Sequence, residues 1–294
     1  MASEREARAL GRRLSFAVLS IAFVVIVSLM VYLYVAQDRM IFLPRPLGED
    51  VRSIVHKARP DAEEISLPTA DGHRLHGWFV RNSDTPLSPA VIYFGGNAEE
   101  VSGFALKAQE LRGLSFALFN YRGYGRSEGS PSEAALFDDA LAIYDFVGAR
   151  PGVDRKHIVA FGRSLGSGVA TYLASQRPLA AVILVTPYDS LSAVAQARYP
   201  YVIVDLLLKH PFDSVTRARA INAPLLALIA GADTVIPPRH AQRLASAWRG
   251  PVTSLVFEGA QHNDIDTDAR YWQSIREFLK QTAVLARTST PTPR

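Results

Sequence analysis

The chain begins with a long apolar pattern that differs from the rest of the sequence. Residues 14–36 contain no charged side chain and are predominantly apolar on every face of a helix. At about 1.5 Å per residue, a helix of this length spans the roughly 30 Å hydrocarbon layer of a bilayer. A buried helix is rarely apolar on all faces so near a terminus, and a cleaved signal peptide has a shorter apolar core of about 7–15 residues. The pattern therefore predicts a transmembrane helix.

From about residue 62 the hydrophobic positions follow a β-strand pattern. "EEISLPT" and "HRLHGWFV" alternate on either side of Asp71-Gly72, which is typical of an antiparallel hairpin. Six short runs of consecutive apolar residues follow, and such runs are typical of strands buried on both faces. These runs are residues 90–96, 115–121, 157–162, 180–186, 224–231 and 253–259.

Helical stretches lie between most of these runs. They are residues 99–112, 132–149, 165–176, 239–248 and 267–285. The alternation of strand and helix implies a parallel sheet covered by helices. The sequence therefore predicts an α/β fold with a mainly parallel sheet, an antiparallel opening hairpin and helices on both faces.

We divide the chain into five parts on this basis. Pro44 and Pro46 follow the apolar helix and are expected to stiffen a short connection rather than continue the helix. The parts are a basic flank at 1–13, the transmembrane helix at 14–36, a stalk at 37–60, the folded body at 61–286 and a disordered tail at 287–294.

Composition and charge exclude several classes of function. The formal net charge of +4 arises at the two ends, whereas the body is balanced, so nothing indicates nucleic-acid binding. The absence of cysteine excludes disulfides, thiolate metal sites and a lipidated cysteine, and the scattered histidines predict no metal site.

Arginines flank the apolar helix on both sides. The adjacent pair Arg12-Arg13 favours a cytoplasmic N-terminus and a body on the outer or periplasmic side of a membrane.

Two stretches match the pattern Gly-x-Ser-x-Gly, "GRSEG" at 125–129 and "GRSLG" at 162–166. An exposed serine nucleophile at the edge of a parallel sheet requires a strand, a sharp turn and an immediate helix. Ser164 has all three, because "HIVAF" precedes it and "LGSGVATYLAS" follows it. Ser127 lies several residues beyond its strand, and no helix begins until after Pro131. We therefore interpret Ser164 as the candidate nucleophile and the segment around Ser127 as a structural loop.

A serine nucleophile needs a base, commonly histidine, and a carboxylate that orients the base. In this architecture the three residues follow in the order serine, acid, histidine, each after a strand. Asp233 in "GADTVIPP" and His262 in "GAQHNDI" satisfy this order. Asp189, which follows the previous strand, is the alternative acid.

Hydrolysis of a carbonyl compound also needs two donors for the developing oxyanion. The backbone N–H of Leu165, at the start of the helix after Ser164, is one candidate. The second is the backbone N–H of Asn97 in "GGNAEE", which follows the strand at 90–96. Asn97 also suits a helix cap, and the two roles are compatible.

These motifs resemble those of the alpha/beta-hydrolase fold serine hydrolases. The resemblance covers about residues 60–285 and involves "YFGGNAEE", "NYRGYGRSEGSPSE", "GRSLGSG", "GADTVIP" and "GAQHNDI". It is strongest with a branch of small membrane-anchored or peripheral hydrolases that includes protein depalmitoylases. That branch usually has His-Gly-Asn-Ala where this chain has Gly95-Gly96-Asn97-Ala98. The missing histidine usually supports the oxyanion loop, so its loss concerns the geometry of this loop.

The motifs predict a serine hydrolase that needs no cofactor and acts on an acyl ester, a thioester or an amide. Peptidase activity is the alternative within the same fold, although no acidic cluster for a substrate amine is evident near the motifs. A non-catalytic binding protein on this scaffold is a further alternative, which the intact serine, acid and histidine disfavour. The sequence leaves the oligomeric state open.

An insert at about 188–216 is where such folds commonly build a substrate cap. Its segment "YPYVIVDLLLKHPF" is strongly apolar, and Tyr201, Leu206 and Leu207 are candidate pocket residues. A crossover helix packed on the sheet is an equally good explanation of this pattern. If the segment lines a pocket, it favours a lipid-like acyl substrate from a nearby bilayer.

Overall fold

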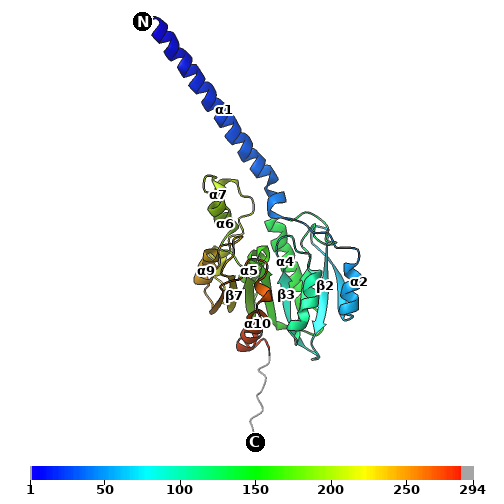
Figure 1. Ribbon diagram of the computed structural model, residues 1–294. Helices are drawn as coiled ribbons and strands as arrows, with labels where there is room; N and C mark the ends of the chain where they lie inside the picture. Colours follow the sequence, from blue (N-terminus) through cyan, green and yellow to red (C-terminus); the bar gives the residue numbers. More distant parts are fainter. Residues whose placement is uncertain (1, 286–294) are drawn as a thin grey trace.

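The computed structural model of the chain describes residues 2–285, and the strands of this part form one eight-stranded sheet (Figure 1). The strands are β1 (Ala62–Pro68), β2 (Arg74–Asn82), β3 (Ser88–Phe94), β4 (Leu114–Phe119), β5 (Val153–Arg163), β6 (Ala181–Val185), β7 (Leu225–Ala230) and β8 (Val252–Phe257). Their order in the sheet is β1-β2-β4-β3-β5-β6-β7-β8. The pairs β1/β2 and β2/β4 are antiparallel, and the remaining pairs are parallel. The predicted α/β fold with an antiparallel opening hairpin is confirmed.

Helices cover both faces of the sheet. They include α3 (Ser102–Lys107), α4 (Glu133–Gly148), α5 (Leu165–Gln176), α9 (Pro238–Ala247) and α10 (Arg270–Gln281), with single 3-10 turns at η1 (Ala108–Glu110) and η2 (Ile265–Thr267). Alternate residues of each central strand enter different cores, as Ile92 and Val91 of β3 do. Ile92 packs in the core under α4, α5 and α9, and Val91 packs in the core under α3 and α10. Burial on both faces explains why these strands are continuous apolar runs.

The insert between β6 and β7 forms three short helices rather than one crossover helix. These are α6 (Leu191–Arg198), α7 (Val204–Leu207) and α8 (Ser214–Ala218). The side chain of Ser190 caps α6 by accepting a hydrogen bond from the N–H of Ala193. We refer to α6, α7 and the residues between them as the cap.

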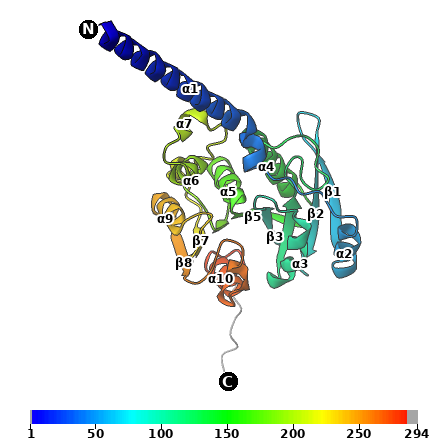
Figure 2. The ribbon, with the colours of Figure 1, turned by 45° about the horizontal axis from the view of Figure 1, so that its top comes forward.

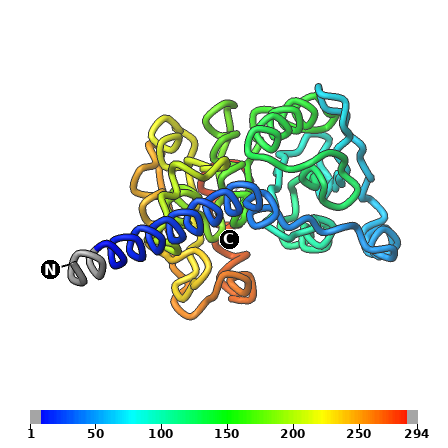
Figure 3. The backbone as a smooth tube through the Cα atoms, turned by 90° about the horizontal axis from the view of Figure 1, so that it is seen from above, coloured from blue at the N-terminus to red at the C-terminus, as the bar shows by residue number. Residues whose placement is uncertain are grey.

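The N-terminal helix α1 (Ala2–Ile41) is the longest element of the described chain. It projects away from the body, and the cap lies beside its C-terminal part (Figures 1 and 2). Viewed from above, it passes over the side of the body that carries the cap (Figure 3). The most apolar 18-residue window of its segment Ala9–Ile41 has a mean hydropathy of 2.8 and contains no buried residue, so the segment is long and apolar enough to cross a membrane. The predicted apolar helix at 14–36 lies within it.

The segment predicted as a stalk is part of the folded body instead. Helix α1 ends at Ile41, just before Pro44, as proline requires. Phe42 is 2% exposed and packs in the core under α4 and α5. Pro46 then forms a bridge to Gly125, and α2 (Val51–Ala58) buries Val55 in the core under α3 and α10. The predicted tail at 287–294 lies outside the described residues.

Helix α5 passes very close to the ends of β3 and β5. A Cβ atom on Gly162 would lie 2.3 Å from the carbonyl oxygen of Gly166, and a Cβ on Gly166 would lie 2.0 Å from that of Phe94. Real Cβ atoms do not approach backbone oxygens this closely. Glycine is therefore required at both positions for α5 to lie where it does.

We predict that Gly166→Ala destabilises the fold by about 3 kcal/mol or more, because the added methyl group must displace the backbone of β3. Thermal unfolding of the purified full-length chain measures this effect. Gly103→Ala in α3 is the matched control, since a Cβ there would meet nothing within 4 Å. The control should be neutral or stabilising by up to about 1 kcal/mol, because alanine has the higher helix propensity. Equal unfolding temperatures for Gly166→Ala and the wild type would refute the packing argument.

Candidate active site

The candidate site lies where the connections of the sheet change direction. The central strand β3 has β4 on one side and β5 on the other, so the chain leaves the ends of β3 and β5 toward opposite sides of the sheet. In open α/β sheets, such a point leaves a crevice at the carboxyl ends of the strands. Ser164 directly follows β5, and the loop from Gly95 to Asn97 directly follows β3. Phe94 and Gly162 are partners across these two strands, which places both loops at the same edge.

Ser164 occupies the sharp turn between β5 and α5. Its φ of 49° lies in the left-handed region, which is uncommon for a residue other than glycine. Its N–H donates to the carbonyl of Val185 at the end of β6, at 2.9 Å, and its carbonyl accepts from the N–H of Ser167, also at 2.9 Å. These bonds hold the turn, so the Ser164 hydroxyl has a defined direction.

The structure brings Ser164, His262 and Asp233 together in one hydrogen-bonded chain. The distance from His262 Nε2 to Ser164 Oγ is 2.9 Å, and that from His262 Nδ1 to Asp233 Oδ2 is 2.7 Å. The other carboxylate oxygen of Asp233 accepts the N–H groups of Val235 and Ile236, both at 2.8 Å. Asp233 and His262 are 5% and 7% exposed. With Nδ1 protonated toward the carboxylate, Nε2 is free to accept the proton of the serine hydroxyl.

Asp189, the alternative acid, lies in a different cluster. Its carboxylate contacts His240 Nδ1 at 2.8 Å and Arg243 Nε at 2.9 Å, and both Asp189 and His240 are buried. The structure therefore does not bring Asp189 to His262.

Ser127, in the other Gly-x-Ser-x-Gly match, binds the backbone. Its hydroxyl accepts from the N–H of His76 at 2.9 Å and donates to the carbonyl of Asn120 at 2.8 Å. Its segment is a structural loop, as the sequence indicated.

The backbone N–H groups of Leu165 and Asn97 face no protein acceptor. Among the described residues, neither N–H donates a hydrogen bond. Leu165 is the first residue of α5, where the helix dipole and the unpaired N–H favour negative charge. Asn97 does not cap α3, which begins at Ser102, and its side-chain oxygen instead accepts from Tyr124 Oη and from the N–H groups of Leu43 and Ala98, each at 2.9 Å.

Side chains that the sequence did not single out hold this loop without the usual histidine. Glu99 accepts from the N–H of Gly96 at 2.7 Å, from Tyr93 Oη at 2.7 Å and from Arg163 Nη1 at 3.1 Å. Tyr121 Oη donates to the carbonyl of Gly95 at 2.8 Å. The spacing of Glu99, three residues after Gly96, is that of an acidic residue reaching back to an N–H and could have indicated its role.

Burial keeps the three tyrosines of this loop protonated. It raises the pKa of Tyr93 and of Tyr121 well above the ordinary value, and the charge of Glu99 adds to both shifts. Burial also raises the pKa of Tyr124 to about 12. The hydroxyls of Tyr121 and Tyr124 therefore remain hydrogen-bond donors to the loop, and that of Tyr93 remains a donor to Glu99.

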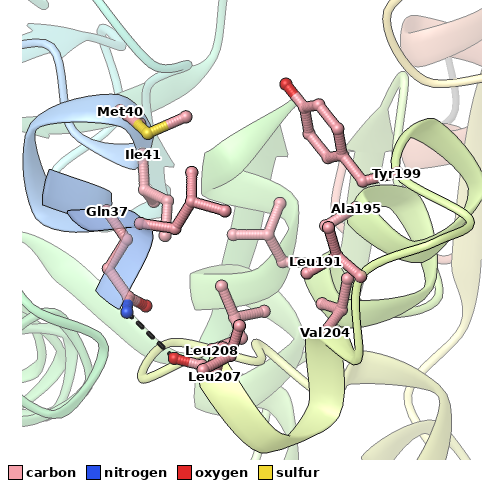
Figure 4. Close-up of a pocket in the computed structure, with 11 residues that line it drawn as sticks. Gln37, Met40, Ile41, Leu191, Ala195, Tyr199, Val204, Leu207 and Leu208 are labelled. Atoms are coloured by element: carbon pink, nitrogen blue, oxygen red, sulfur yellow. Dashed lines mark hydrogen bonds between the residues drawn. The ribbon is translucent and has the colours of Figure 1, made fainter. Parts of the chain in front are cut away.

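Only one of the three candidate pocket residues of the cap lines a cavity. Leu207 lines an apolar cavity between the cap and α1 (Figure 4). Tyr201 and Leu206 are 98% and 75% exposed and do not line it. Successive residues of a helix are rotated by about 100°, so Leu206 of α7 faces solvent while Leu207 lines the cavity, and Tyr201 lies in the connection before α7. Within residues 2–285, no group of three or more His, Asp or Glu side chains could hold a metal ion.

Comparison with known proteins agrees with this geometry. The family model described as the alpha/beta hydrolase fold matches residues 89–203. An uncharacterized protein of Mycobacterium tuberculosis, Rv2307c, is 36% identical over 272 residues, which cover 91% of this chain and 96% of that protein. Alpha/beta hydrolase domain-containing protein 17B of Xenopus tropicalis is 30% identical over 222 residues, which cover 74% of each chain.

Solved structures show the same fold. The structure of the Pyrococcus furiosus esterase Pf2001 matches with a TM-score of 0.64 at 19% identity, over 83% of this chain and 97% of that chain. The sheet order, the strand–turn–helix geometry at Ser164 and these similarities lead to one conclusion: the chain belongs to the alpha/beta-hydrolase fold family.

Proposed function

We propose that this protein is a serine hydrolase that cleaves acyl esters or thioesters through an acyl-enzyme intermediate. The family supports a hydrolase. The observation that carries the finer proposal is the continuous hydrogen-bonded chain from Ser164 through His262 to Asp233. A serine is a weak nucleophile until a base accepts its proton, and this chain supplies the base and the group that orients it.

In the first half of the reaction, Ser164 Oγ attacks the carbonyl carbon of the substrate while His262 Nε2 takes the hydroxyl proton. Asp233 accepts the hydrogen bond from Nδ1 and stabilises the charged imidazole. His262 then gives its proton to the departing oxygen or sulfur, and the acyl group stays on Ser164. In the second half, His262 takes a proton from water as the water oxygen attacks the acyl carbon. The bond from the acyl carbon to Ser164 Oγ then breaks, His262 returns the proton to Oγ, and the carboxylic acid leaves.

The oxyanion that forms in each half lies near two backbone donors in this proposal. The N–H groups of Leu165 and Asn97 have no protein acceptor among the described residues and lie on the two loops at the same edge of the sheet. Loss of one such donor typically costs about 3–4 kcal/mol of transition-state stabilisation. The bonds that Glu99, Tyr121 and Tyr124 make to the loop would keep the Asn97 donor in position.

We further propose that the enzyme is anchored in a membrane by α1 and acts on apolar acyl substrates near that membrane. The segment Ala9–Ile41 has the length and hydropathy of a membrane-spanning helix. The Arg12-Arg13 pair favours an orientation with the N-terminus in the cytoplasm and the body on the opposite side, and this orientation is part of the proposal. A bilayer beside the cap would supply acyl substrates at high local concentration.

We expect a fluorophosphonate probe to label Ser164 in the purified full-length protein, because only an activated serine reacts with it. Mass spectrometry of the labelled peptide identifies the residue. Ser164→Ala should abolish labelling and esterase activity. Ser127→Ala is the matched control and should keep both, since the Ser127 hydroxyl only binds backbone groups. An adduct on Ser127, or full activity of Ser164→Ala, would exclude Ser164 as the nucleophile.

Asp233→Asn should lower kcat by about four orders of magnitude, because the amide no longer holds His262 in the required tautomer. Asp189→Asn is the matched control, because it makes the same substitution at the alternative acid. Steady-state kinetics on the folded proteins measure kcat of both variants. The control should keep kcat within a few-fold, although loss of the His240 and Arg243 contacts lowers its unfolding temperature. A large loss of kcat in Asp189→Asn, together with a nearly unchanged kcat in Asp233→Asn, would assign the role of the acid to Asp189.

A further inference from the structure

An apolar cavity lies between the end of α1 and the cap. Its volume is about 230 Å³. Figure 4 shows Met40 and Ile41 on one wall and the cap residues on the other. The lining residues are Leu33, Gln37, Met40, Ile41, Leu191, Ala195, Tyr199, Val202, Val204, Leu207 and Leu208. The cavity is partly open to solvent and its lining is almost entirely apolar, so it suits a hydrocarbon ligand.

Gln37 is the one amide among these lining side chains, and its hydrogen-bonding groups are used. Its Nε2 donates to the carbonyls of Leu207 at 2.9 Å and Tyr34 at 3.0 Å. Its Oε1 accepts the N–H of Lys209 at 2.7 Å. Gln37 therefore joins α1 to the cap and offers the cavity no unsatisfied polar group. Apart from the hydroxyl of Tyr199, the cavity offers a ligand mainly hydrocarbon contacts.

The cavity is next to the part of the chain that would meet the bilayer. Its α1 wall belongs to the apolar segment Ala9–Ile41. At the tip of the cap, Tyr199, Tyr201, Ile203 and Leu206 are between 51% and 98% exposed. Aromatic and aliphatic side chains exposed together beside a membrane helix are typical of a surface at the membrane interface. A hydrocarbon chain could thus pass from the lipid to the cavity without crossing water.

On each side of the cavity, a residue two or three positions along the chain from the lining makes a hydrogen bond to one of the two residues that carry the proposed oxyanion donors. Two residues after Ile41, the N–H of Leu43 donates to the side chain of Asn97 at 2.9 Å. Three residues before Leu191, Tyr188 Oη donates to the carbonyl of Leu165 at 3.2 Å. The segments that line the cavity are therefore bonded to the two residues, Asn97 and Leu165, whose N–H groups are the proposed donors.

We propose that this cavity binds the acyl chain of the substrate, drawn from the bilayer between α1 and the cap. The inference rests on the proposed function and adds to it a named site and a second wall that the membrane helix supplies. Each methylene group buried there should raise kcat/KM up to about fourfold, until the cavity is filled.

Substitution at Ala195 tests the site, because a larger side chain there fills the cavity. The assay measures kcat/KM for acetyl to decanoyl esters with the full-length chain in nanodiscs. In the wild type, kcat/KM should climb with chain length. Ala195→Phe should lower the ratio of octanoyl to acetyl kcat/KM at least tenfold. Ala197→Phe, on the exposed side of the same helix, should keep the wild-type ratio.

A labelling experiment tests binding without hydrolysis. Ser164→Ala in nanodiscs is irradiated with a photoreactive diazirine fatty acid, and mass spectrometry maps the adducts. We expect adducts on cavity residues of α6 and α7, a several-fold loss when Ala195→Phe is added, and no loss when Ala197→Phe is added. Equal cavity labelling with and without Ala195→Phe would overturn the site.

The two experiments separate the inference from the function on which it rests. Cavity labelling combined with a chain-length profile that Ala195→Phe does not change would mean that a bystander lipid occupies the cavity, which refutes the proposal. Cavity labelling in a protein without any esterase activity would contradict the proposed function and still support a hydrocarbon-chain site. Esterase activity with a flat chain-length profile in the wild type would keep the hydrolase and refute the acyl-chain site.

Discussion

The close passage of α5 over the ends of β3 and β5 is the constraint on which the rest of the site depends. Glycine at 162 and 166 lets backbone pack against backbone, and Ser164 lies between these positions with a left-handed φ of 49°. The N–H of Ser164 is tied to Val185 on the next strand. The serine hydroxyl therefore projects from a turn held by three strands, and His262 and Asp233 reach it from the ends of two others.

The end of α1 is fixed to the body by polar contacts as well as by apolar burial. Gln37 bonds to the backbone of the cap, and Asp38 contacts His210 at 2.9 Å. Phe42 is buried under α4 and α5, and the N–H of Leu43 reaches Asn97. The orientation of the apolar helix and the shape of the loop after β3 are thus linked through a few residues. Direct contacts therefore join the end of α1 to the body, and no separate stalk lies between them.

Local patterns predicted much of this structure. Each predicted strand forms, because the runs of apolar residues are buried on both faces, and the helix after Ser164 begins and ends at the predicted residues. The segment at 37–60, which was predicted as a stalk, instead contributes Phe42 and Val55 to the two cores. The burial of these residues depends on partners far along the chain. The same reason explains why Glu99, Tyr121 and Tyr124 were missed as supports of the loop. Their bonds join segments that only the folded sheet places side by side.

The sequence by itself determined the order of strands and helices, the choice of Ser164 over Ser127 and the apolar character of α1. The period of the apolar positions, the spacing of the glycines and the length of an apolar run involve residues that are close together in the chain, so the sequence shows them directly. The sequence favoured Asp233 and kept Asp189 as the alternative acid, and the tertiary structure decided that Asp233 contacts His262. The tertiary structure alone decided that Leu207, but not Tyr201 or Leu206, lines a cavity with α1. These choices depend on which loop ends meet in space, and that is set by strand order and helix packing between residues up to 172 positions apart in the chain.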